Sequence, residues 1–80
     1  MSVEQDLDTE VYVRLLDEGV DVWRPVRATK LSNGSFRLGR PDGYDPETET
    51  WEFPPHALVR CEMKTFSDGT RSLVAVAEAA

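Results

Sequence analysis

Hydrophobic and polar residues alternate along most of this chain, and a period of two is typical of strands with one buried face. In residues 11–16, VYVRLL, the alternation places Val11, Val13 and Leu15 together on one face. No segment has the apolar spacing of a convincing amphipathic helix. The pattern therefore predicts a chain built from strands.

The alternation divides into six short segments. The last of them, RSLVAVA, is also compatible with the start of a short helix, and we favour a strand. Proline cannot donate to a strand ladder, so Pro54 and Pro55 are expected to end the fourth strand. We expect strands over residues 11–16, 20–31, 35–39, 51–53, 57–66 and 71–77.

Three of the connections have the composition of tight turns. They are residues 17–19 (DEG), 32–34 (SNG) and 67–69 (SDG), each with a glycine that tolerates a positive φ. Strand parity then assigns the core. The residues expected to face inward are Phe36 and Leu38, then Trp51 and Phe53, then Val59, Cys61 and Met63.

Six short strands in 80 residues leave too little chain for two full sheets. A strongly bent barrel lets one set of inward residues form the whole core and hides the sheet edges. We therefore expect an all-β fold, a small SH3-like barrel of five to six antiparallel strands, with an OB-like barrel as the alternative. The barrel is assigned to residues 10–77, after a flexible acidic N-terminal arm at 1–9 and before a C-terminal tail at 78–80.

The net charge of −6 is unevenly spread. Residues 22–41 contain five bases and no acid, whereas residues 42–52 contain five acids and no base. One interpretation is that the two segments neutralise each other at the surface. The alternative is a nucleic-acid-associated barrel that uses the basic hairpin at 24–40, although the overall charge disfavours it. The bases in question are Arg24, Arg27, Lys30, Arg37 and Arg40.

The segments LLDEGVDVWRPV, WEFPP, VRCE and SDG together resemble a group of small bacterial proteins of unknown function. The resemblance covers nearly all of residues 11–76. It implies a domain similar to an SH3-like barrel, and it implies a fold more than an activity. SH3-like barrels in general bind peptides, nucleic acids or other subunits, which is an analogy at the level of the fold.

The sequence offers no constellation for catalysis, a metal or a cofactor, so we expect none of the three. Cys61 lies in the middle of a strand on an apolar face, and nothing in the spacing pairs it with His56, the only histidine. The acidic loop at 42–49 does not match a calcium-binding loop, and the glycines never form a phosphate cradle. The single cysteine and the absence of an apolar run favour a cytoplasmic protein without a membrane segment.

The aromatic residues are the remaining candidates for a functional surface. Trp23 allows two interpretations, because Pro25 can shift the strand parity. In the first, Trp23 closes one end of the barrel and its indole N–H bonds to a backbone carbonyl. In the second, Trp23 anchors a groove that binds a proline-rich or cationic ligand. We predict an interaction module that binds a protein or peptide partner. Its predicted surface consists of Tyr12, Trp23, Arg24, Arg27, Tyr44 and Trp51.

Overall fold

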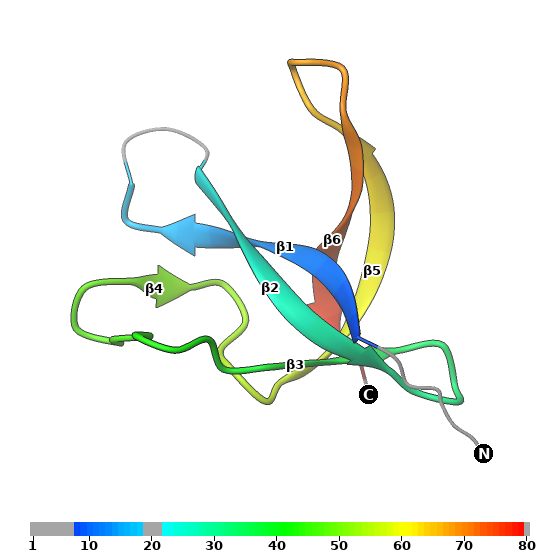
Figure 1. The fold of residues 1–80 in the computed structure, drawn as a ribbon, viewed down its shortest axis with the longest axis horizontal. Coiled ribbons are helices and arrows are strands. Elements are labelled where there is room, and N and C mark those ends of the chain that lie inside the picture. Colours follow the sequence, from blue (N-terminus) through cyan, green and yellow to red (C-terminus); the bar gives the residue numbers. More distant parts are fainter. Residues whose placement is uncertain (1–7, 19–21, 80) are drawn as a thin grey trace.

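A computed structural model describes residues 8–18 and 22–79, and it shows strands and no helix in those ranges (Figure 1). Most of the predicted arm, the end of the first turn and the last residue of the predicted tail lie outside the described residues. No helix in the described part is long and apolar enough to cross a membrane. The strands are β1 (Asp8–Leu16), β2 (Val22–Lys30), β3 (Phe36–Leu38), β4 (Thr50–Trp51), β5 (Leu58–Thr65) and β6 (Arg71–Glu78).

Five of the strands close into a ring. The hydrogen-bonded order is β2-β3-β5-β6-β1, β1 pairs with β2 again, and β4 adds two residues to β1. Apart from the two-residue β4, which lies between β3 and β5 in the chain and pairs with β1, the ring strands follow one another in chain order. This meander differs from the Greek-key order of an OB-like barrel. The structure therefore confirms the predicted small all-β barrel, with a strand order that fits the SH3-like prediction better than the OB-like alternative.

One detail of that prediction is wrong, because the strands are not all antiparallel. β1 and β6 pair in parallel, with Val11 opposite Leu73 and Tyr12 opposite Val74. In a meander successive strands alternate in direction, so the first and fifth strands of a five-stranded ring run the same way. The parallel pair is the consequence of closing an odd-numbered meander.

The core follows the predicted alternation. Phe36, Trp51 and Phe53 are each less than a tenth exposed, and the partly buried Leu15 packs against them. Removing such side chains from water is the main favourable contribution to folding in a domain of this size. The largest fully buried side chains are Val11, Val13, Val26, Leu38 and Val59.

Met63 does not face the core as predicted. Its side chain is 58% exposed, although Val59 on the same strand is fully buried. The pairing of β5 with β6 shifts register between Arg60 and Cys61, and β3 covers β5 only at its first two residues. Beyond that point the β5–β6 hairpin projects from the barrel (Figure 1). Among the described residues, Met63 is neither part of the core cluster nor packed against it.

Candidate functional site: the outer aromatic cluster

Tyr12 and Trp23 lie together on the outer face of the barrel. In the antiparallel pair of β1 and β2, Tyr12 is opposite Pro25, and Trp23 is opposite Arg14. Residues directly opposite each other share a face, and so do residues two apart on one strand. Since Val13 faces the core, these four residues face outward.

The third aromatic residue of this site is Phe66, which directly follows β5. Its ring centroid lies 5.4 Å from that of Tyr12 and 5.8 Å from that of Trp23, and it meets the indole edge-on at 80°. Contacts of this geometry each contribute about 0.5–1.5 kcal/mol beyond the area they bury. We call Tyr12, Trp23 and Phe66 the outer aromatic cluster. All three side chains are only partly buried.

The outer aromatic cluster has a buried neighbour on the same face. Val74 is opposite Tyr12 in the parallel ladder and is 4% exposed, yet it does not belong to the main core cluster. β6 therefore buries apolar residues on both of its faces, Val74 outside and Ala75 inside. The rings of the outer aromatic cluster therefore lie on the same face as a buried side chain, Val74, and are partly shielded from solvent.

A groove of about 360 Å³ runs beside the three rings. The ammonium of Lys64 lies 5.8 Å from the centroid of Trp23 and 5.9 Å from that of Phe66, within range of a cation–π contact. Asp68 accepts hydrogen bonds from the backbone N–H and the hydroxyl of Thr70, at 3.0 and 2.7 Å. The backbone bond first, then the hydroxyl, lowers the pKa of the Asp68 carboxyl. The groove is lined by Tyr12, Trp23, Phe66, Ser67, Asp68 and Thr70.

The predicted residues Arg24, Tyr44 and Trp51 lie elsewhere, in a second group around Glu49. The indole N–H of Trp51 donates to Glu49 Oε1 at 2.9 Å, and the Arg24 guanidinium pairs with the same carboxylate. The Tyr44 ring packs edge-on against Trp51 with centroids 4.8 Å apart. Trp51 is only 5% exposed, so this group is part of the barrel structure. We call Arg24, Tyr44, Glu49 and Trp51 the loop cluster.

These positions bear on the two interpretations of Trp23. The tryptophan that packs into the barrel and donates its indole N–H is Trp51, and its acceptor is a carboxylate. Trp23 lies on the outer face against Phe66, which favours its interpretation as part of a surface over its interpretation as the cap of the barrel.

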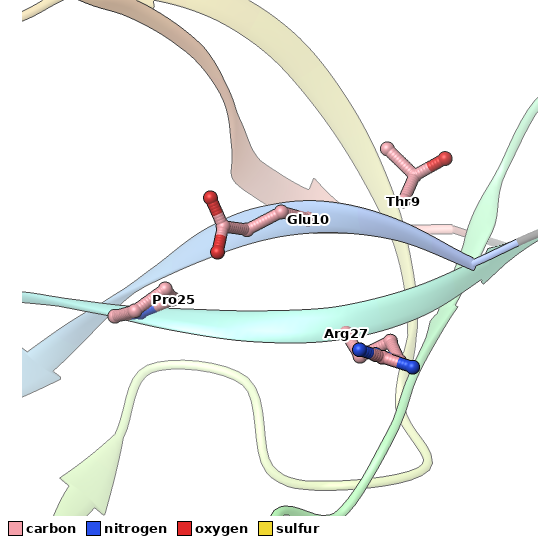
Figure 2. A pocket seen from close by; sticks show the side chains of 4 residues that line it. All are labelled: Thr9, Glu10, Pro25 and Arg27. Carbon is pink, nitrogen blue, oxygen red and sulfur yellow. The ribbon is translucent and has the colours of Figure 1, made fainter.

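Arg27 belongs neither to the outer aromatic cluster nor to the loop cluster. It lines a depression of about 460 Å³ with Thr9, Glu10 and Pro25, on the outer face where β1 pairs with β2. Figure 2 shows the charged ends of Glu10 and Arg27 apart from each other along the two strands. This depression is the larger one, but it has no aromatic wall. The six predicted residues thus fall into three groups, of which only Tyr12 and Trp23 share the aromatic groove.

Phe66, Lys64 and Val74 were missed by the sequence analysis. Lys64 shares a strand face with Glu62, and two charged residues on one face predict that this face is exposed to solvent. Phe66 lies on the same face by strand parity. A signal for the cluster was present, because Phe66 stands immediately before the SDG turn and follows the parity of Lys64. An aromatic residue on an otherwise charged face indicates a second apolar contact there.

Cys61 is the single cysteine of the chain. Burial raises the pKa of the Cys61 thiol to about 11, so it stays protonated at neutral pH. Within residues 8–18 and 22–79, no group of three or more His, Cys, Asp or Glu side chains is placed to hold a metal ion. No family model, no curated protein and no solved structure matches this chain.

Proposed function

We propose that this protein is a non-enzymatic interaction module that binds a peptide or protein partner at the outer aromatic cluster. The observation that carries the proposal is the placement of Tyr12 and Trp23 outside a barrel whose core is already complete. Tryptophan and tyrosine are the side chains that contribute most at binding interfaces. Here they remain partly exposed while Phe66 fixes their orientation.

The groove suits an extended peptide with an apolar anchor. Its walls are aromatic, and an extended chain can lay a proline or another apolar side chain against such rings. Lys64 and Asp68 add one positive and one negative group beside the groove, and these favour a partner with charges of both signs. A rigid aromatic surface also lowers the entropy lost on binding.

A cytoplasmic, non-catalytic role belongs to the same proposal. The single cysteine, Cys61, is suited to a reducing compartment, and the raised pKa of its thiol makes it a poor nucleophile.

Binding of nucleic acid remains the alternative. Lys30 and Arg37 are exposed on neighbouring strands and could contact phosphates. Arg24, in contrast, is engaged by the Glu49 carboxylate, and the net charge of −6 repels a polyanion. Salt-sensitive binding of mixed RNA or DNA, weakened in Arg37→Ala and unchanged in Trp23→Ala, would favour this alternative.

The test is a screen of the full chain against an array of extended peptides, followed by titration of the strongest binder. We expect affinity to fall by about tenfold or more in Trp23→Ala and in Phe66→Ala. The control is Arg37→Ala on β3, which should bind as the parent does. Thermal unfolding of each variant checks that the barrel is intact. Peptide binding that is unchanged in both aromatic variants would overturn the proposal.

A further inference from the structure

β5 has an open edge along its second half. On one side it pairs with β6 through Thr65, but on the other side β3 covers only Leu58 and Val59. In the described part of the chain no strand pairs with the open side of residues 61–65, and Figure 1 shows that side facing outward. A row of unpaired backbone groups of this kind is a template for another strand.

The hydrogen bond that closes the β5–β6 hairpin shows which groups point outward. The N–H of Phe66 donates to the carbonyl of Thr70 at 2.8 Å, so Phe66 directs its backbone toward β6. In an antiparallel pair this direction alternates from residue to residue. Lys64 and Glu62 therefore also bond toward β6, and the backbone N–H and C=O groups of Met63 and Thr65 point to the open edge.

β2 has a comparable open edge, but a proline protects it. The carbonyl of Arg27 accepts the N–H of Gly39 on the β3 side, so Pro25 and Trp23 direct their backbones to the same side. Pro25 has no N–H to offer to an incoming strand. β5 contains no proline between Leu58 and Thr65, so its edge can both donate and accept.

The charges along β5 select one kind of incoming strand. Arg60, Glu62 and Lys64 alternate in sign on one face. A second β5 in parallel register, or in antiparallel register centred on Glu62 or Lys64, would place like charges opposite each other, which is unfavourable. In antiparallel register centred on Met63, each Glu62 lies opposite the other copy's Lys64. A register centred on Cys61 would also pair opposite charges, Arg60 with Glu62, but it would need Val59, whose open side β3 already covers.

We propose that β5 binds β5 of a second copy of this chain, antiparallel and centred on Met63. The pairing is isologous, so the same two Glu–Lys contacts form on both sides of a twofold axis. Met63, the most exposed of the large apolar side chains described, meets its own copy at the axis. The proposal does not rest on the peptide-binding function, because the strand pairing uses the backbone edge of the sheet, although Lys64 also lies over the rings of Trp23 and Phe66.

Charge exchange tests this register. Glu62→Lys alone and Lys64→Glu alone each bring like charges together twice in the dimer, and we expect each to weaken dimerisation by about tenfold. An equimolar mixture of the two variants should associate as a heterodimer, since its opposing charges are again complementary. The double variant Glu62→Lys/Lys64→Glu should dimerise as the parent does. Sedimentation equilibrium from micromolar to millimolar concentration measures all four.

Glu47→Lys is the matched control, because it makes the same charge change on an exposed loop residue and should leave the dimer unchanged. A second measurement uses oxidation in a Cys61→Ala background. Met63→Cys should form a disulfide-linked dimer, whereas Thr65→Cys should not, since its two copies would lie about 13 Å apart along the strands. A parent chain that stays monomeric at millimolar concentration, or a mixture of the single variants that associates no better than either alone, would overturn the proposal.

Discussion

The carboxylate of Glu49 is held by the guanidinium of Arg24, a residue 25 positions earlier in the chain. The same carboxylate accepts the indole N–H of the buried Trp51 at 2.9 Å. The side chain of Glu49 therefore connects β2 to the loop before β4, and it provides an acceptor for the buried indole N–H of Trp51. A buried N–H without an acceptor is costly, so this contact fixes where the long polar loop returns to the barrel.

Glu49→Ala should destabilise the protein by about 1–3 kcal/mol, because the Trp51 N–H loses its acceptor. Arg24→Ala should cost less, about 0.5–1 kcal/mol, since it removes a partly exposed ion pair and leaves the indole bond intact. Urea unfolding followed by circular dichroism measures both. Glu47→Ala, on the exposed part of the same loop, is the control and should change stability little. Equal losses in the Arg24 and Glu49 variants would contradict the assigned role of Trp51.

The stabilisation by Glu49 should depend on pH. The hydrogen bond from Trp51, and then the contact with Arg24, lower the pKa of the Glu49 carboxyl below its ordinary value of 4.5. A lowered folded-state pKa gives stability that is fully present above the ordinary value and is lost as pH falls through the folded one. The difference in unfolding free energy between the parent and Glu49→Gln should be constant above about pH 6 and shrink below about pH 4. A difference that grows in acid would show the opposite sign of coupling.

The inward residues of the barrel could be predicted because burial and strand parity coincide there. Val11, Val13 and Leu38 are each fully buried, and they alternate with residues that are exposed or only partly buried. The tight turns at 32–34 and 67–69 could be predicted as well, because Gly34 and Gly69 both adopt the positive φ that these turn sequences indicate.

The candidate site could be predicted only in part. Strand parity predicts an outward Tyr12, and it predicts an outward Trp23 only if Pro25 does not shift the parity; both residues lie on the outer face. Their partner Phe66 comes from the far end of another hairpin, and no local pattern encodes a contact over 43 residues of chain, from Trp23 to Phe66. Met63 was misplaced for a related reason, because parity does not show where a strand leaves the barrel.

Cys61 should react slowly with thiol reagents in the folded protein. Burial raises the pKa of its thiol to about 11, and the thiolate is the reactive form. We expect the rate of reaction with Ellman's reagent at about pH 8 to rise by tenfold or more in denaturing urea. Free glutathione under the same conditions controls for the effect of urea on the reagent. Equal rates in folded and unfolded protein would show that the thiol is accessible.

Gly39 is a position where only glycine fits. A Cβ at this residue would lie 2.7 Å from the carbonyl oxygen of Arg27, which also accepts the Gly39 N–H at 2.8 Å. Gly39→Ala should therefore destabilise by about 2–3 kcal/mol, since backbone atoms must move. Gly69→Ala is the comparison: its φ is +91° but its Cβ meets no atom within 4 Å, and we expect a cost of about 1 kcal/mol. Chemical denaturation should rank the two variants in this order, and the reverse order would contradict the close approach.

The two tryptophans should be distinguishable by fluorescence, because they occupy different environments. Trp51 is 5% exposed in the core, whereas Trp23 is only partly buried on the outer face. The Trp51→Phe variant, which reports Trp23, should emit at longer wavelength and be quenched more strongly by acrylamide than Trp23→Phe, which reports Trp51. Adding Phe66→Ala should increase the quenching of Trp23 further, since it removes the ring that packs edge-on against the indole. Unfolded samples of each variant set the upper limit of quenching. A Trp23 emission as blue-shifted and as protected as that of Trp51 would mean that the aromatic groove is closed.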